Sequence, residues 1–121
     1  MTYEYLTLDQ LLDLAASMGV PHVRDLGLLE SARVRPQIEV FGEESYPSLS
    51  HKAAALLESL VRNHPLLDGN KRLGWTSAIV FLGMNNRAIE VDDDMAVDFV
   101  LSVAAGEMTF EEIVTWFEAR I

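Results

Sequence analysis

The sequence predicts an all-α protein, a bundle of about six helices. Apolar residues recur at helical spacing along almost all of the 121-residue chain. Capping residues, glycines and prolines divide the chain into segments of ordinary helix length. The β-like run Ile89-Glu90-Val91 is too short to build a sheet, and the chain has no internal repeat, low-complexity tract or linker. We therefore expect a single domain over residues 1–121.

The first third of the chain predicts two helices and an irregular stretch. A capping box at residues 7–10 marks the start of a helix that closes before Pro21. A short helix is expected over about residues 26–33, ended by Pro36. The stretch from Gln37 to Ser48 is less regular because it contains helix breakers, and we expect a loop or a flap there.

The middle of the chain predicts two long helices joined by a loop. The apolar positions within residues 53–61 mark a strongly amphipathic helix. Pro65 disfavours helical geometry at the residue before it, so this helix should end at His64. Asn70 is a good cap for the next helix. That helix is apolar on most sides and should form the buried centre of the fold.

Two further helices complete the predicted bundle. The acidic run Asp92 to Asp94 offers caps for a helix that ends at Gly106, since acidic groups suit a helix start. Capping explains this run without a cation site. Thr109 and Glu112 form a second capping box, which opens the last helix. The two tryptophans lie among apolar neighbours and are expected in the core or in a groove.

The composition bounds the class of protein. Half of the residues are hydrophobic, which at this length is enough for a real core. The chain lacks cysteine, which excludes a disulfide framework, a zinc–thiolate site and a cysteine nucleophile and fits a reducing compartment. The first residues lack a signal-peptide pattern, and the longest apolar run, Ala78 to Leu82, is far too short to span a membrane. We expect a soluble, cytoplasmic protein with no membrane partner.

A cationic spot stands out on this acidic chain. Nine lysines and arginines are outnumbered by nineteen acidic residues, for a net charge of −10. The eleven residues from Arg62 to Arg72 nevertheless hold three cations and one acid. Such a spot suits a phosphorylated small molecule, whereas a nucleic acid needs a broad basic footprint. We expect no direct nucleic-acid partner.

The cationic spot contains the run His64-Pro65-Leu66-Leu67-Asp68-Gly69-Asn70-Lys71-Arg72. An unperturbed histidine has a pKa of about 6.5, so His64 can act as a base near neutral pH. Asp68 is a hard oxygen ligand of the kind that holds Mg²⁺ together with substrate phosphates. Lys71 and Arg72 add charge at a helix start, where free backbone N–H groups bind anions. The alternative is a structural corner in which His64 is a cap and Asp68 pairs with Arg72. The combination of residue types favours catalysis.

This run resembles the Fic-type signature H-P-F-x-D/E-G-N-G/K-R, and its lysine-bearing form is similar to that of the death-on-curing (Doc) toxins. The likeness extends over nearly the whole chain, with further matching blocks at residues 24–33, 35–37, 53–57, 63–65 and 103–107. The resemblance implies an all-helical Fic fold and a nucleotide-using transferase. It also implies a cognate, Phd-like antitoxin as partner.

The resemblance assigns roles by position. His64 matches the base that deprotonates a target hydroxyl, and Asp68 matches the acid that binds the metal, here Mg²⁺. Lys71 is expected to take part in catalysis beside them. The positions expected to contact the phosphates of ATP are Arg62, Gly69, Asn70, Lys71 and Arg72.

Position 71 bears on which group is transferred. Adenylyl-transferring Fic enzymes usually have glycine there, and the resemblance implies that Lys71 favours an inverted nucleotide that presents its γ-phosphate. The implied reaction is phosphorylation of a protein hydroxyl, with a threonine of elongation factor Tu as the expected target. Gly69 instead follows the adenylyltransferase pattern, so AMP transfer stays an alternative. Leu66 replaces the usual phenylalanine and is expected to anchor the loop in the core.

A further alternative is a catalytically silent Fic-fold binding module held by its antitoxin. A degenerate scaffold would be expected to have lost part of the motif. Here the set His64, Asp68, Asn70, Lys71 and Arg72 is intact, which favours an active enzyme.

Overall fold

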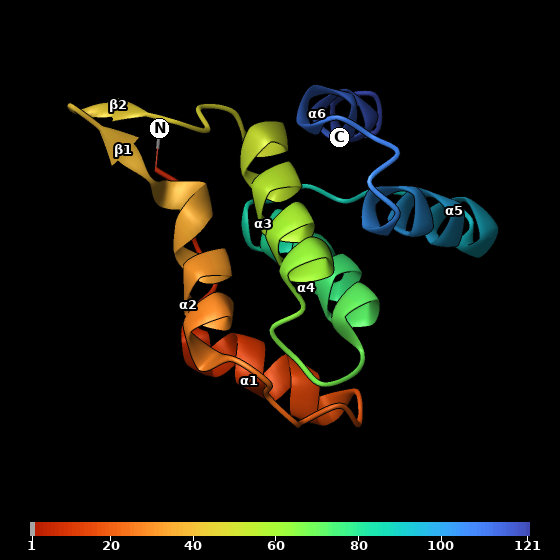
Figure 1. The fold of residues 1–121 in the computed structure, drawn as a ribbon. Coiled ribbons are helices and arrows are strands. Elements are labelled where there is room, and N and C mark those ends of the chain that lie inside the picture. Colours follow the sequence, from red (N-terminus) through yellow and green to blue (C-terminus); the bar gives the residue numbers. More distant parts are fainter. Residues whose placement is uncertain (1) are drawn as a thin grey trace.

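The computed structural model describes residues 2–121, which form six α-helices, a short 3₁₀ helix and a two-stranded hairpin (Figure 1). The elements are α1 Leu8–Ser17, α2 Leu26–Val34, the 3₁₀ helix η1 Arg35–Gln37, β1 Glu39–Val40, β2 Glu43–Glu44, α3 Leu49–Asn63, α4 Asn70–Met84, α5 Asp93–Ala104 and α6 Phe110–Glu118. The predicted all-α bundle of about six helices is confirmed. Within the described residues, no helix combines the length and apolarity needed to cross a bilayer.

Three of the predicted helix starts, those of α1, α5 and α6, are formed by the predicted caps. The Thr7 hydroxyl accepts the backbone N–H of Gln10 at 3.1 Å, and the Gln10 side chain accepts the N–H of Thr7 at 2.9 Å. Thr109 and Glu112 make the same reciprocal pair at the start of α6. Asp92 caps α5. Each cap contributes about 1 kcal/mol by satisfying N–H groups that the helix itself leaves without partners.

The centre of the bundle is α3, whereas the sequence indicated α4. Ten of the fifteen residues of α3 are buried, against seven of the fifteen in α4. The reason lies in the neighbours of α3, which packs against α2, α4, α5 and α6. The small side chains of residues 53–55 are fully buried and let these neighbours approach. One face of α4 stays partly exposed, although its sequence is apolar on most sides.

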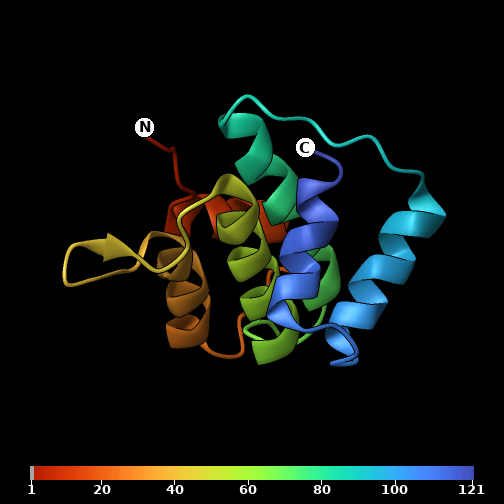
Figure 2. The ribbon, with the colours of Figure 1, turned by 90° about the horizontal axis from the view of Figure 1, so that it is seen from above.

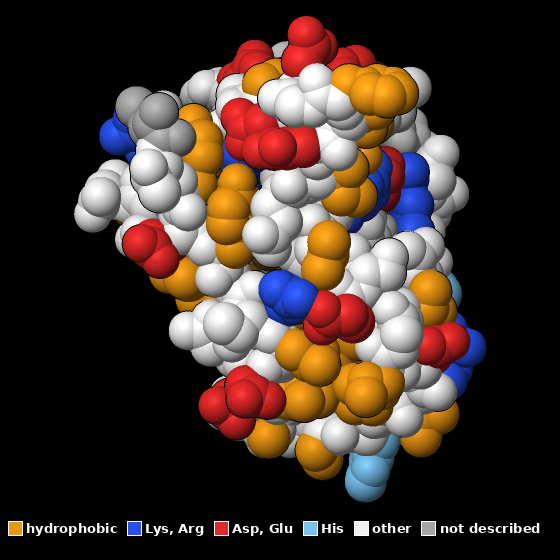
Figure 3. Space-filling model, turned by 90° about the vertical axis from the view of Figure 1, so that its left-hand side faces the viewer, with side chains coloured by type: hydrophobic (Ala, Val, Ile, Leu, Met, Phe, Trp, Pro, Cys, Tyr) orange, Lys and Arg blue, Asp and Glu red, His pale blue; other side chains and the backbone are white. Residues whose placement is uncertain are grey.

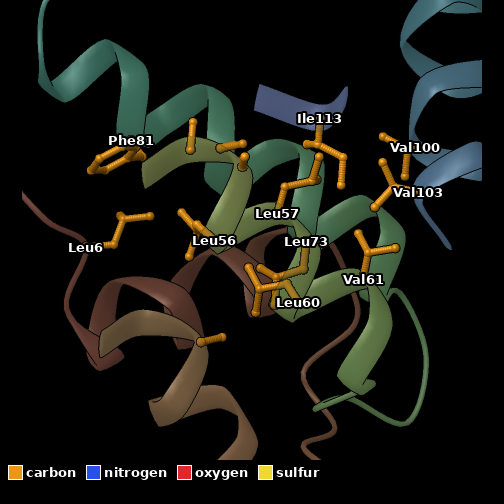
Figure 4. Close-up of a cluster of buried hydrophobic side chains, with 14 of the residues drawn as sticks. Leu6, Leu56, Leu57, Leu60, Val61, Leu73, Phe81, Val100, Val103 and Ile113 are labelled. Atoms are coloured by element: carbon orange, nitrogen blue, oxygen red, sulfur yellow. The ribbon is translucent and has the colours of Figure 1, made fainter. Parts of the chain in front are cut away.

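The α3–α4 interface fixes the loop that joins these two helices. Leu57 and Val61 of α3 lie among the core side chains that α4, α5 and α6 contribute (Figure 4). A β-carbon placed on Gly74 would lie 2.6 Å from Cγ2 of Val61, so α4 approaches α3 more closely than any other residue would allow. Truncating a fully buried leucine such as Leu57 to alanine costs about 2–5 kcal/mol. Residues 64–69 are therefore held between two firmly packed helix ends.

The stretch expected to be a loop or a flap contains a short antiparallel hairpin, which projects from the bundle (Figures 1 and 2). Its tip residues Phe41 and Gly42 have φ values of 51° and 80°, as two-residue hairpin turns require. Phe41 is fully exposed. The face that carries the hairpin and α2 shows mostly acidic and hydrophobic side chains, with lysine and arginine in isolated spots (Figure 3).

Candidate active site

The loop between α3 and α4 begins at His64, whose backbone leaves the right-handed helical conformation for the left-handed one. This residue is the C-cap of α3, with φ 52° and ψ 59° in the left-handed region. The predicted helix end at His64 is thus confirmed, and the buried Pro65 follows it. Histidine adopts this region more readily than branched residues do, yet the conformation still needs support from its surroundings.

Leu66 anchors the loop in the core, as expected. Its side chain is 1% exposed. The side-chain amide of Asn70 holds its backbone from both sides: Asn70 Oδ1 accepts the N–H of Leu66 at 2.8 Å, and Asn70 Nδ2 donates to its carbonyl at 3.0 Å. The buried Asn70 amide therefore shapes the loop.

The predicted capping role of Asn70 is wrong. Helix α4 begins at Asn70 itself, and Gly69 is the N-cap, with φ 86° and no side chain to satisfy the first turn. Since the Asn70 side chain turns back to the loop, the backbone N–H groups at this helix start lack a capping side chain. A phosphate contact from Asn70 would come from its backbone N–H.

The candidate reactive side chains of the motif belong to the loop between α3 and α4 and to the first turn of α4. His64, Asp68, Lys71 and Arg72 are all exposed. The Asp68 carboxylate accepts the N–H of Gly69, the next residue, at 2.8 Å, which restricts its side chain. Of the structural alternative, the cap at His64 is formed but the ion pair between Asp68 and Arg72 is not. Arg72 donates to the carbonyl of Met18 at 3.3 Å, and the four ion pairs within residues 2–121 involve other residues.

A magnesium ion held by Asp68 would need further ligands from water and from the phosphates of a bound substrate. Within residues 2–121, His, Asp and Glu side chains do not gather in groups of three or more suited to a metal ion. One oxygen of Asp68 accepts a hydrogen bond from Gly69, and the exposed carboxylate offers its other oxygen. This donor set fits Mg²⁺, which proteins hold by one or two carboxylates together with water and substrate phosphates.

Arg62 is used inside the fold, away from the expected phosphate contact. Its Nε and Nη2 donate to the carbonyls of Val103 and Met108 at 2.9 and 2.7 Å. Its Nη1 pairs with Glu58 at 2.6 Å, and Glu58 also accepts from Arg35 at 2.9 Å. Arg62 therefore ties α3 to the end of α5 and to the connection that follows. We leave it out of the proposed site.

A segment far away in the sequence holds the loop. Val23 and Leu66 form an antiparallel bridge, and the N–H of Leu67 donates to the carbonyl of His22 at 2.9 Å. The N–H groups of Arg24 and of the residue after it both donate to the carbonyl of Pro65, at 2.8 and 3.0 Å. The sequence indicates no role for this segment beyond its resemblance to the family. Its partners lie some forty residues further along the chain.

An apolar groove of about 280 Å³ adjoins the cationic helix start. Lys71, Arg72 and Trp75 form its α4 side. Its α5 side is Asp93 followed by an apolar stripe at helical spacing, Ala96, Val97, Val100 and Leu101. Val97 and Leu101 are 55% and 49% exposed, so the α5 side of the groove presents apolar surface to solvent. The expectation that Trp75 lies in the core or in a groove is confirmed.

Comparison with known proteins agrees with the motif and the fold. The family model described as "Fic/DOC family" matches residues 5–82, which include the entire run from His64 to Arg72. The protein named "Toxin Doc" from Mycolicibacterium smegmatis is 47% identical over 97 residues, covering 78% of this chain and 75% of that protein. A match over more than half of the chain, with a relative of this identity, shows that the chain belongs to the Fic/DOC family.

Proposed function

We propose that this protein is the toxin of a toxin–antitoxin pair and that it transfers the γ-phosphate of ATP to a hydroxyl of a translation factor. A threonine of elongation factor Tu is the expected acceptor, which would place the activity in the cytoplasm. The observation that carries the proposal is that four exposed residues of one motif, His64, Asp68, Lys71 and Arg72, belong to the short loop after α3 and to the uncapped start of α4 that follows it. Membership of the Fic/DOC family and the likeness to Toxin Doc support it.

The proposed step is an in-line transfer. The acceptor hydroxyl loses its proton to the imidazole of His64, and its oxygen forms a bond to the γ-phosphorus. The bond between the γ-phosphorus and the β–γ bridging oxygen breaks, and ADP leaves. His64 then releases the proton to water. Such a reaction needs mainly positioning and charge neutralisation, which Lys71, Arg72 and the backbone N–H groups of the first turn of α4 supply.

Asp68 would hold Mg²⁺ together with the phosphates. When bound, the ion would neutralise the charge that develops on the leaving phosphate oxygens. The hydrogen bond from the N–H of Gly69 keeps the Asp68 carboxylate at the loop, beside the helix start that receives the phosphates. Since both oxygens belong to an exposed side chain, the metal can enter with the nucleotide.

Lys71 supports phosphoryl transfer over adenylyl transfer. Its long side chain occupies space that glycine leaves open in adenylyltransferases, and its ammonium is a point charge suited to phosphate. Gly69 offers little support for AMP transfer, because a packing reason accounts for it. Its φ is 86°, and a β-carbon there would lie 2.7 Å from Cγ1 of Val20.

The hairpin is proposed to serve as the flap that aligns the acceptor segment. Its tip carries the exposed Val40 and Phe41, and residues 39–44 are exposed throughout. An exposed strand edge of this kind offers backbone donors and acceptors to an extended peptide.

The antitoxin is proposed to be Phd-like and to lay an amphipathic segment in the groove between α4 and α5. The stripe of apolar residues on α5 suits the apolar face of such a segment, and the two cations of the lining, Lys71 and Arg72, outnumber its one acid, Asp93, and so suit an acidic residue. Co-expression with the adjacent upstream gene tests this: the two proteins should purify as one complex. Separate elution of the two would reject the pairing for this protein.

Intact-mass analysis of elongation factor Tu after incubation with the protein, ATP and Mg²⁺ tests the activity. The proposal predicts the added mass of one phosphoryl group, which His64→Ala should abolish. An adenylyl mass would establish the alternative reaction. No added mass, from a preparation shown to be folded, would favour a silent binding module.

A further inference from the structure

We propose that Arg24 is a positioning residue for the transfer reaction: it holds the peptide of His64 in the left-handed conformation from which the imidazole reaches the acceptor hydroxyl. Arg24 Nε donates to the carbonyl of His64 at 2.7 Å, and its Nη2 donates to the carbonyl of Asn63 at 3.0 Å. The inference rests on the proposed role of His64 as the base.

The two carbonyls that Arg24 binds belong to the end of α3. The last carbonyls of a helix have no partner within the helix and must be satisfied by other groups. Here one guanidinium satisfies two successive carbonyls with two of its nitrogens. The positive charge also lies at the negative end of the dipole of α3, which adds to the attraction.

The backbone next to Arg24 completes the clamp. Its own N–H and that of Asp25 both donate to the carbonyl of Pro65. Three successive carbonyls, those of Asn63, His64 and Pro65, therefore accept hydrogen bonds from residues 24 and 25. The backbone bonds to Pro65 do not depend on which side chain stands at position 24, whereas those to His64 and Asn63 do.

The bond from the Arg24 side chain to the His64 carbonyl matters because no hydrogen bond holds the His64 ring itself. Among the hydrogen bonds within residues 2–121, none involves the imidazole of His64, whose side chain is exposed. Its direction is thus set by the backbone, which is left-handed at a residue that is not glycine. Without the guanidinium, the carbonyl of His64 is free to turn toward water, and the imidazole turns with its own backbone.

Arg24 is well placed to be removed without unfolding the protein. It is exposed and outside the core, and the bridge between Val23 and Leu66 remains. Lys71 and Arg72, the proposed phosphate contacts, belong to α4, and the side chain of Arg72 donates to the carbonyl of Met18. Loss of Arg24 should therefore affect the catalytic step far more than nucleotide binding.

The test compares Arg24→Ala with Arg87→Ala, a matched control at an exposed arginine outside the loop. Arg24→Ala should lower kcat about 100-fold, the size expected when a reacting group is misplaced by about 1 Å. KM for ATP should change less than about threefold, because Arg24 is not one of the proposed phosphate contacts. Arg24→Lys should recover part of kcat, and added guanidinium at non-denaturing concentration should partly rescue Arg24→Ala but not His64→Ala.

Unchanged kcat in folded Arg24→Ala would overturn the proposal. The proposal would also be overturned if added guanidinium did not raise the kcat of Arg24→Ala. It would equally be overturned if KM for ATP changed by as large a factor as kcat. If the wild-type protein transfers no group at all, the proposed function fails, and NMR of the His64 ring still tests the structural part of the inference, that Arg24 fixes the position of this ring. Arg24→Ala should shift the His64 ring resonances while Arg87→Ala leaves them in place. Identical His64 spectra for the two variants would reject the positioning role.

Discussion

Val20 packs against the backbone of Gly69 so closely that a β-carbon on Gly69 would lie 2.7 Å from Cγ1 of Val20 and 2.8 Å from its Cβ. Real side chains do not approach this closely, so one of the two segments would have to move. The φ of 86° at Gly69 adds a second reason for glycine, since other residues adopt this region at a cost. The connection after α1 thus contributes to the shape of the candidate site.

Gly69→Ala should lower the free energy of unfolding by about 1–3 kcal/mol, through backbone strain and the clash with Val20 together. Urea unfolding followed by circular dichroism measures this. Val20→Ala in the same chain should restore only part of the loss, because the β-carbon of residue 20 stays in the way and the strain persists. Full stability in Gly69→Ala would show that the loop adapts freely.

His64→Ala should abolish transfer while leaving the melting temperature close to that of the wild type. The exposed side chain contributes little to packing, whereas loss of a general base typically costs about 10²–10⁴-fold in rate. His22→Ala is the matched control, since His22 is also exposed and contributes its backbone carbonyl to the loop. Transfer at the wild-type rate by folded His64→Ala would remove His64 from the mechanism.

Asp68→Asn should weaken the binding of Mg·ATP much more than that of metal-free ATP. The carboxylate acts on the nucleotide through the ion, and an amide is a weaker ligand for a hard cation. Isothermal titration calorimetry with and without Mg²⁺ measures both affinities. Asp13→Asn, at an exposed acid of α1, should change neither. An equal loss with and without the metal would sink the assignment of Asp68.

Lys52 should make stability depend on alkaline pH. Its side chain is fully buried, and Nζ donates to Glu44 at 2.9 Å and to the carbonyl of Pro36 at 3.1 Å. Burial acts to lower the pKa of Lys52, but hydrogen bonds and charge interactions with Glu44 and Tyr5 outweigh it and raise the pKa above its ordinary value of 10.5. Because the pKa is higher in the folded protein, charged Lys52 adds to the free energy of unfolding. This stabilisation is fully present below pH 10.5 and is lost as the pH rises through the raised pKa.

Urea unfolding at a series of pH values from neutral to above 11 checks this prediction about Lys52. The wild-type midpoint should fall at the alkaline end as the ammonium is neutralised. Lys52→Met keeps most of the buried volume without the charge, so its midpoint should fall less over the same range. Parallel curves for the two proteins would show that tyrosines and other groups account for the whole alkaline loss.

Those parts of the fold that depend on local chemistry were predictable from the sequence. The capping boxes at Thr7 and Thr109 and the helix end before Pro65 act within a few residues, and each is present as predicted. The position of α3 at the centre was not predictable from periodicity, because it depends on how many neighbours a helix acquires. The hairpin tip Phe41-Gly42 lacks the Asn-Gly or Asp-Gly pair that marks such turns most clearly.

In the candidate site, too, local features were predictable from the sequence and tertiary contacts were not. The run from His64 to Arg72 was recognisable as a motif. Arg62 and Asn70 carry suitable chemistry in the sequence, but their side chains are occupied by partners that only the fold brings near. Arg24 shows the opposite: the sequence indicates no role for it, but the fold brings its side chain to the carbonyls of Asn63 and His64. Backbone carbonyls have no sequence signature, so this contact could not be predicted.

Lys71 should determine which phosphate of ATP reaches His64. Lys71 is exposed in the first turn of α4, and within residues 2–121 none of the four ion pairs engages it, so its ammonium is available to phosphate. ATP labelled at the γ-phosphate should label the acceptor, and ATP labelled at the α-phosphate should not. Lys71→Gly should lower γ-label transfer, through the loss of both charge and bulk.

A second variant separates these two contributions of Lys71. Lys71→Met removes the charge but keeps the side chain's length, so it should lower the transfer of γ-label without allowing that of α-label. If α-label is transferred by Lys71→Gly but not by Lys71→Met, bulk at this position excludes the adenylyl orientation and charge only assists. Transfer of α-label by the wild-type protein would contradict the assignment, because the nucleotide would then bind in the adenylyltransferase orientation despite the lysine.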